Sequence, residues 1–125
     1  MVVSKKLSKA VGNDFMKKGD HKTALEKYSN GLAVEPDHAM ILSNRALCHH
    51  KLGHRQEALQ DAQRVIVLKP DFYKGYVRAA MVLRELKRPQ EALEILKKAP
   101  HNDEVGKLVA EVRPEAEKAE EAWSK

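Results

Sequence analysis

The chain has 125 residues, of which 42% are hydrophobic, 33% are charged and only 5% are aromatic. This length suits a single domain, and the scarcity of aromatic side chains favours closely packed helices over a β-sandwich. The single cysteine, Cys48, excludes an internal disulfide, and residues 1–9 are too polar for a secretory signal, so we expect a cytoplasmic protein. No apolar run is long enough to span a membrane. The net charge of +5 suits an acidic partner without indicating nucleic acid.

The chain repeats itself with a period of 34 residues. Ala24, Ala58 and Ala92 are separated by this interval, and a leucine follows each of them. Such a period is typical of stacked helix-turn-helix units. The predicted units cover residues 5–38, 39–72 and 73–106.

The first unit predicts two helices. The first helix, Lys5–Lys18, should stop at Gly19, because glycine readily adopts the left-handed conformation that ends helices. Asp20 should cap a second helix that runs to about Val34. A proline then prevents that helix from continuing, and Asp37 is expected to cap the first helix of the next unit.

The second and third units follow the first with one departure. Gly53 and Asp71 of the second unit repeat the helix stop and the helix cap of the first. In the third unit, Lys87 replaces the glycine, and Pro89 stands at the start of the second helix, where proline is tolerated.

Small residues recur where paired helices should meet. Gly12 belongs to the first expected helix and Ala24 to the second. Small side chains let the two helices approach closely, and larger ones such as Tyr28 should fill the space beside them.

A last helix is expected over about residues 102–123. Val105, Leu108 and Val112 recur at helical spacing, so the apolar face of this helix should cover the third unit while its polar face is exposed to solvent. Pro114 is expected to kink or restart this helix.

The period, the small residues and the glycine and proline positions resemble the tetratricopeptide-repeat (TPR) family over about residues 5–112. The resemblance implies an all-α fold in one domain, 1–125: three TPR helix-turn-helix repeats stacked as a right-handed superhelix plus a C-terminal capping helix. It also implies that the first helix of each pair lines a concave face. Departures include Leu42 and His49, where the family often has aromatic residues, but neither breaks the register.

Five polar residues on these first helices form the candidate binding site. Lys9 and Asn13 are four residues apart, so they project from one face of their helix. Lys74 and Arg78 have the same spacing in the third unit, and Asn44 lies in the second. Because packed helices lie about 8–10 Å apart, the five side chains can converge on one anionic group.

The five residues resemble the carboxylate clamp of co-chaperone TPR domains, position by position. The resemblance implies that Lys9, Asn13 and Asn44 hold a main-chain carboxylate. Lys74 would take an aspartate side chain, and Arg78 the preceding backbone. The implied partner is the C-terminal Glu-Glu-Val-Asp tail of the ninety- and seventy-kilodalton heat-shock chaperones, bound by a monomer without a cofactor.

Further residues are expected on or near the inner face, where they would contact upstream residues of the peptide. Equally, some are ordinary interhelical core. These weaker candidates are Met16, Met40, Ser43, Leu47, Lys51, Val77 and Met81.

Other functions fit the sequence less well. A TPR scaffold for an internal peptide or a folded partner would not depend on Lys9 or Asn44. A nucleic-acid binder is disfavoured by the interspersed acidic residues and the lack of aromatic groove residues. His49, His50 and His54 lack acidic or cysteine partners at metal-binding spacing, and no catalytic group is predicted.

Overall fold

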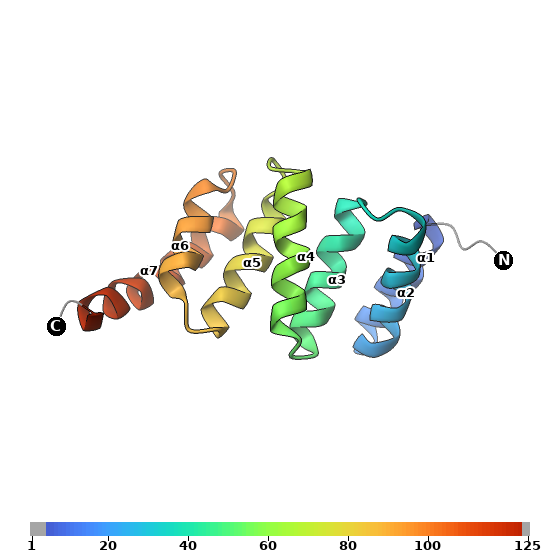
Figure 1. Ribbon diagram of the computed structural model, residues 1–125, viewed down its shortest axis with the longest axis horizontal. Helices are drawn as coiled ribbons and strands as arrows, with labels where there is room; N and C mark the ends of the chain where they lie inside the picture. Colours follow the sequence, from blue (N-terminus) through green and yellow to red (C-terminus); the bar gives the residue numbers. More distant parts are fainter. Residues whose placement is uncertain (1–4, 124–125) are drawn as a thin grey trace.

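The computed structural model describes residues 5–123, and within this range the chain forms seven α-helices and no strand. The expected all-α fold is therefore confirmed. Figure 1 shows the helices following one another along the long axis, with α1 at one end and α7 at the other. Residues 1–4, 124 and 125 of the expected domain lie outside the described range. The helices are α1 (Lys5–Lys17), α2 (His21–Val34), α3 (Ala39–Lys51), α4 (Arg55–Leu68), α5 (Tyr73–Glu85), α6 (Pro89–Lys98) and α7 (Asp103–Trp123).

The first six helices form three pairs that begin at Lys5, Ala39 and Tyr73, a spacing of 34 residues. Each helix contacts the next along the chain, and α1–α3, α3–α5 and α5–α7 are also in contact. Among the described residues, no two even-numbered helices bring their Cα atoms within 8 Å of each other. The stack therefore curves with the odd-numbered helices on its tighter, inner side, which is the side that should carry the candidate site.

The turns within the three pairs share one backbone geometry. Gly19 and Gly53 both have φ +81°, and Lys87 has φ 62°, although it carries a β-carbon. In each turn this residue and the next donate backbone hydrogen bonds to the end of the preceding helix. Asp20 caps α2 as predicted, with its carboxylate accepting from Thr23 N at 3.1 Å.

The predicted caps of α3 and α5 are wrong. The N-cap position of each helix lies one residue later than predicted, which leaves Asp37 and Asp71 outside it. His38 caps α3 instead, and its Nδ1 atom accepts a 3.2 Å hydrogen bond from Ile41 N. Phe72 precedes α5 without a side-chain cap.

The helix pairs are held together by small buried side chains. Ala24, Ala58 and Ala92 are completely buried, as the close approach of paired helices requires. A β-carbon on Gly12 would lie only 2.5 Å from the Tyr28 ring, so no larger residue fits there without displacing the ring.

Helix α7 closes the stack. Val105, Leu108 and Val112 are buried against the third helix pair, which confirms the expected apolar face. The helix does not restart at Pro114 but runs through it as one element. None of the described helices combines the length and the apolar character needed to cross a bilayer.

Candidate functional site

Two asparagines from neighbouring inner helices meet directly at the candidate site. The Nδ2 atom of Asn44 on α3 donates a 3.0 Å hydrogen bond to Oδ1 of Asn13 on α1. The same oxygen also accepts a hydrogen bond from the hydroxyl of Tyr28 on α2. Because both donors converge on Oδ1, the Asn13 amide is fixed with its two N–H groups directed away from them. Asn13 therefore presents amide donors rather than an amide acceptor.

Tyr28 holds this arrangement from inside the core. The side chain is 1% exposed and lies between α1 and α3. Burial raises the pKa of Tyr28 to about 12; the Cys48 thiol adds to the rise, and the positive charge of Arg78 opposes it. The phenol therefore remains a hydrogen-bond donor throughout the physiological pH range.

Arg78 on α5 extends the site towards the third helix pair. Its side chain is largely withdrawn from solvent, and burial lowers the pKa of the guanidinium, while Glu104, Tyr73 and Tyr28 act in the opposite sense. The Nε atom is buried and has no hydrogen-bond partner among the described residues. A buried guanidinium nitrogen without an acceptor is costly, so Arg78 is ready to bind an acceptor from outside the chain.

Lys74 lies one turn before Arg78 on the same helix. Its Nζ atom is 3.6 Å from a carboxylate oxygen of Glu104 on α7 and 5.5 Å from the centre of the Tyr73 ring. Lys9 lies one turn before Asn13 on α1 and is half-buried. Asn13 and Asn44 are thus in direct contact, Lys74 and Arg78 lie one turn apart on α5, and Lys9 lies one turn before Asn13 on α1.

The apolar candidates fall into different environments. Val77 and Met81 line a hollow of about 200 Å³ between α5 and α7, which also includes Glu104 and Leu108. Ser43 is only 2% exposed, because it lies on the face of α3 that packs into the stack. The contact of Ser43 with a ligand stays a prediction.

The other weaker candidates differ in exposure. Met16 and Leu47 are half-buried, and Met16 packs against the core of the first two helix pairs. Lys51 is exposed at the end of α3. Met40 is also exposed and lines a second hollow.

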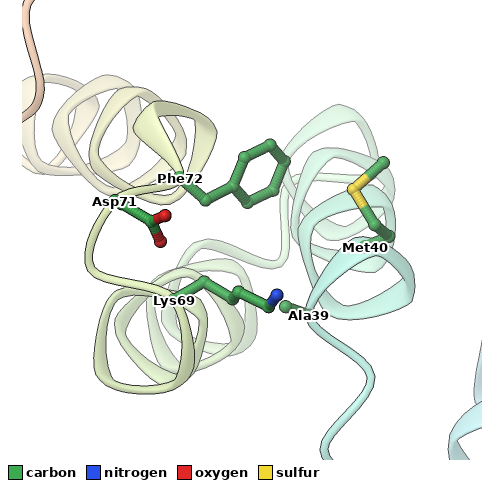
Figure 2. Close-up of a pocket in the computed structure, with 5 residues that line it drawn as sticks. All are labelled: Ala39, Met40, Lys69, Asp71 and Phe72. Carbon is green, nitrogen blue, oxygen red and sulfur yellow. The ribbon is translucent and has the colours of Figure 1, made fainter.

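This second hollow of about 250 Å³ lies beside the start of α3. Figure 2 shows Phe72 and Lys69 projecting from the α4–α5 turn towards α3, which contributes Ala39 and Met40 to the lining. None of the five predicted polar site residues lines it.

His49 and His50 each contact other ionisable side chains. His49 Nδ1 lies 3.1 Å from His54 Nδ1, and its Nε2 is 3.9 Å from the Asp61 carboxylate. His50 pairs with Glu85 of α5. Burial lowers the pKa values of His49 and His50, against the opposing influence of these carboxylates. Among the described residues, no three histidine, cysteine or acidic side chains form a group that could hold a metal ion.

The comparison with known families agrees with the geometry. A family model described as a TPR repeat matches residues 12–53, and one described as a tetratricopeptide repeat matches residues 51–106. Together the two matches extend from within α1 into the first turn of α7. The chain belongs to the tetratricopeptide-repeat family. Its seven helices form the TPR superhelix with a capping helix at the C-terminal end.

The TPR domain also resembles individual curated proteins. The Hsp70-Hsp90 organizing protein of Triticum aestivum is 37% identical over 98 residues, which make up 75% of this chain and 17% of that relative. The chain therefore spans only a small part of the curated relatives that it matches.

Solved TPR structures extend the resemblance to peptide complexes. The second TPR domain of human RPAP3, in complex with the HSP70 peptide SGPTIEEVD, has a TM-score of 0.77 and 25% identity, over 85% of this chain and 92% of that one. The second TPR of Spaghetti (RPAP3), bound to the HSP90 peptide SRMEEVD, has a TM-score of 0.72 and 28% identity, over 75% and 87% of the two chains.

Two residues of this TPR site were not predicted as part of it. The sequence indicates Tyr28 only as a core filler, and Glu104 falls in a helix expected only to close the stack. Tyr28 and Asn13 are 15 residues apart, and Glu104 and Lys74 are 30 apart, so no local spacing signals either contact.

Proposed function

We propose that this TPR domain is a co-chaperone adaptor that binds the C-terminal Glu-Glu-Val-Asp tail of a heat-shock chaperone. In this proposal Lys9, Asn13 and Asn44 hold the main-chain carboxylate. Lys74 pairs with the side chain of the last aspartate, and Arg78 donates to the peptide backbone.

The observation that carries the proposal is the fixed orientation of Asn13. A carboxylate has several acceptor sites and no donor, so it needs a surface that offers N–H groups alone. The hydrogen bonds from Tyr28 and Asn44 occupy the acceptor oxygen of Asn13 and leave its N–H groups for a ligand. Asparagine contributes these donors without the repulsion that a third neighbouring cation would add.

The second support comes from Arg78 and from related structures. The buried Nε atom of Arg78 lacks an acceptor among the described residues, and a backbone carbonyl of an extended peptide would supply one. Related TPR domains are bound to peptides that end in Glu-Glu-Val-Asp. The proposal includes the cytoplasmic location expected from the sequence.

Calorimetry with two versions of one peptide tests the proposal. The free acid SRMEEVD should bind with a dissociation constant near 1 μM, about −8 kcal/mol, and the C-terminal amide should bind at least tenfold more weakly. Lys9→Ala should weaken binding of the acid about tenfold, whereas Lys22→Ala, at an exposed lysine of α2, should not change it. Equal binding of acid and amide would contradict the proposal and favour an internal peptide as ligand.

A further inference from the structure

One acidic residue of the capping helix lies against the proposed ligand-binding lysine. Glu104 is in the first turn of α7, and its carboxylate is 3.6 Å from Nζ of Lys74 on α5. Both side chains are partly exposed, at 45% and 35% respectively. The negative charge of Glu104 thus lies at ion-pair distance from the lysine that, in the proposed function, pairs with the aspartate side chain of a ligand.

Two further ion pairs between α5 and α7 involve Arg84 instead of Lys74. Glu111 and Glu115 both pair with Arg84, at 3.3 Å and 2.7 Å. Arg84 is not among the proposed ligand-binding residues, so these two pairs can be explained by the attachment of the capping helix alone. The Glu104–Lys74 pair also joins the two helices, but its lysine is a proposed ligand-binding residue, so the charge of Glu104 can act on the ligand as well as on the attachment of α7.

We propose that Glu104 is an internal competitor for Lys74 that weakens the binding of ligands carrying a C-terminal aspartate. The proposal rests on the proposed function, because it requires Lys74 to bind the ligand. A ligand carboxylate must either displace Glu104 or share the lysine with it, and like charges brought together oppose binding. An exposed ion pair is weak, so the ligand can still displace it.

This competition has a consequence for specificity. A peptide that ends in asparagine has no charged side chain and can leave the Glu104–Lys74 pair intact. A peptide that ends in aspartate gains the lysine but loses that pair. Glu104 therefore reduces the preference of the domain for aspartate over asparagine at the last position, which a purely structural residue would not do.

The decisive variant is Glu104→Gln, which removes the charge and keeps the shape. By calorimetry it should bind the free acid SRMEEVD roughly fivefold more tightly, while an otherwise identical peptide ending in asparagine should change less than about twofold. Asp103→Asn is the matched control, because it removes the same charge from the neighbouring exposed position of α7. In a Lys74→Ala background, Glu104→Gln should strengthen binding less than in the wild type, because only the influence of Glu104 on Arg78 remains.

The outcomes separate this proposal from the proposed function. If the wild-type domain binds acid and amide peptides equally, the proposed function fails and the inference fails with it. If the wild type prefers the acid but Glu104→Gln changes neither peptide, or strengthens both peptides equally, the inference alone is overturned. An equal gain from Asp103→Asn would also overturn it, since a general charge effect would then explain the result.

Discussion

Replacing Tyr28 with phenylalanine should weaken ligand binding at a residue that the ligand does not touch. Tyr28 is buried on α2, and its hydroxyl is one of the two donors that fix the Asn13 amide. Phenylalanine retains the ring that packs against α1 and removes only this hydrogen bond. Asn13 then keeps one donor, Asn44, and its amide can more easily turn its oxygen towards the ligand carboxylate.

The size of the effect follows from the value of one hydrogen bond. A typical intramolecular hydrogen bond contributes about 0.5–1.5 kcal/mol. Without this hydrogen bond, the Asn13 amide is turned in some molecules so that its oxygen faces the ligand, and these molecules do not bind the carboxylate. The apparent affinity falls with the fraction of molecules that remain able to bind. Because Asn44 still donates to this oxygen, at least about half of the molecules should keep the competent form, so binding should weaken by up to about twofold, or about 0.4 kcal/mol. The free energy of unfolding should fall by about 1 kcal/mol, since the Asn13 oxygen loses one of its partners.

Tyr76→Phe provides a control with the same chemical change. Tyr76 is also buried, and its hydroxyl donates a 2.7 Å hydrogen bond to the carbonyl of Pro70, which is not one of the five proposed ligand-binding residues. Urea denaturation should show that both variants lose similar stability. Calorimetry with the free acid SRMEEVD should show weakened binding for Tyr28→Phe alone.

Unchanged affinity in Tyr28→Phe, with the same loss of stability as in Tyr76→Phe, would refute this reasoning. The hydroxyl would then stabilise the fold without orienting Asn13. Equal weakening in both variants would also refute it, because a general loosening of the stack would account for the result.

Three further predictions concern stability, each measured by denaturation. Lys87→Gly should raise the free energy of unfolding by about 0.5–1 kcal/mol, because a residue with a β-carbon is strained at φ 62°. The greater conformational freedom of glycine in the unfolded chain offsets part of this gain. An unchanged free energy of unfolding would contradict the prediction. Gly12→Ala should lower it by about 1–3 kcal/mol, since the new methyl group would collide with Tyr28, and a neutral effect would show that the ring moves freely. Burial raises the pKa of Tyr28 to about 12 and of Cys48 to about 11, so the unfolded chain loses these protons first and stability should fall above about pH 9. Tyr28→Phe should remove the part of this loss between about pH 10 and 12, and an unchanged alkaline profile would argue against a buried phenol.

The helix pairs were predictable because their signals are local. A period of 34 residues, glycine at two turns and alanine at the pair contacts each act within one unit. Even the exception at Lys87 follows the same backbone geometry, because the surrounding hydrogen bonds impose it. The helix caps were predicted less well: a shift of one residue at the start of a helix moved the cap from Asp37 to His38.

What the sequence determined by itself is the architecture and the type of each proposed ligand-binding residue. Spacing along a helix is enough to place Lys74 and Arg78 on one face, or Lys9 and Asn13 on another. The tertiary structure decided how these residues are held. Tyr28 reaches Asn13 from another helix, and Glu104 reaches Lys74 from the capping helix. Such contacts depend on how the helices stack. The spacing of residues along one helix does not show which side chain of a distant helix will contact it.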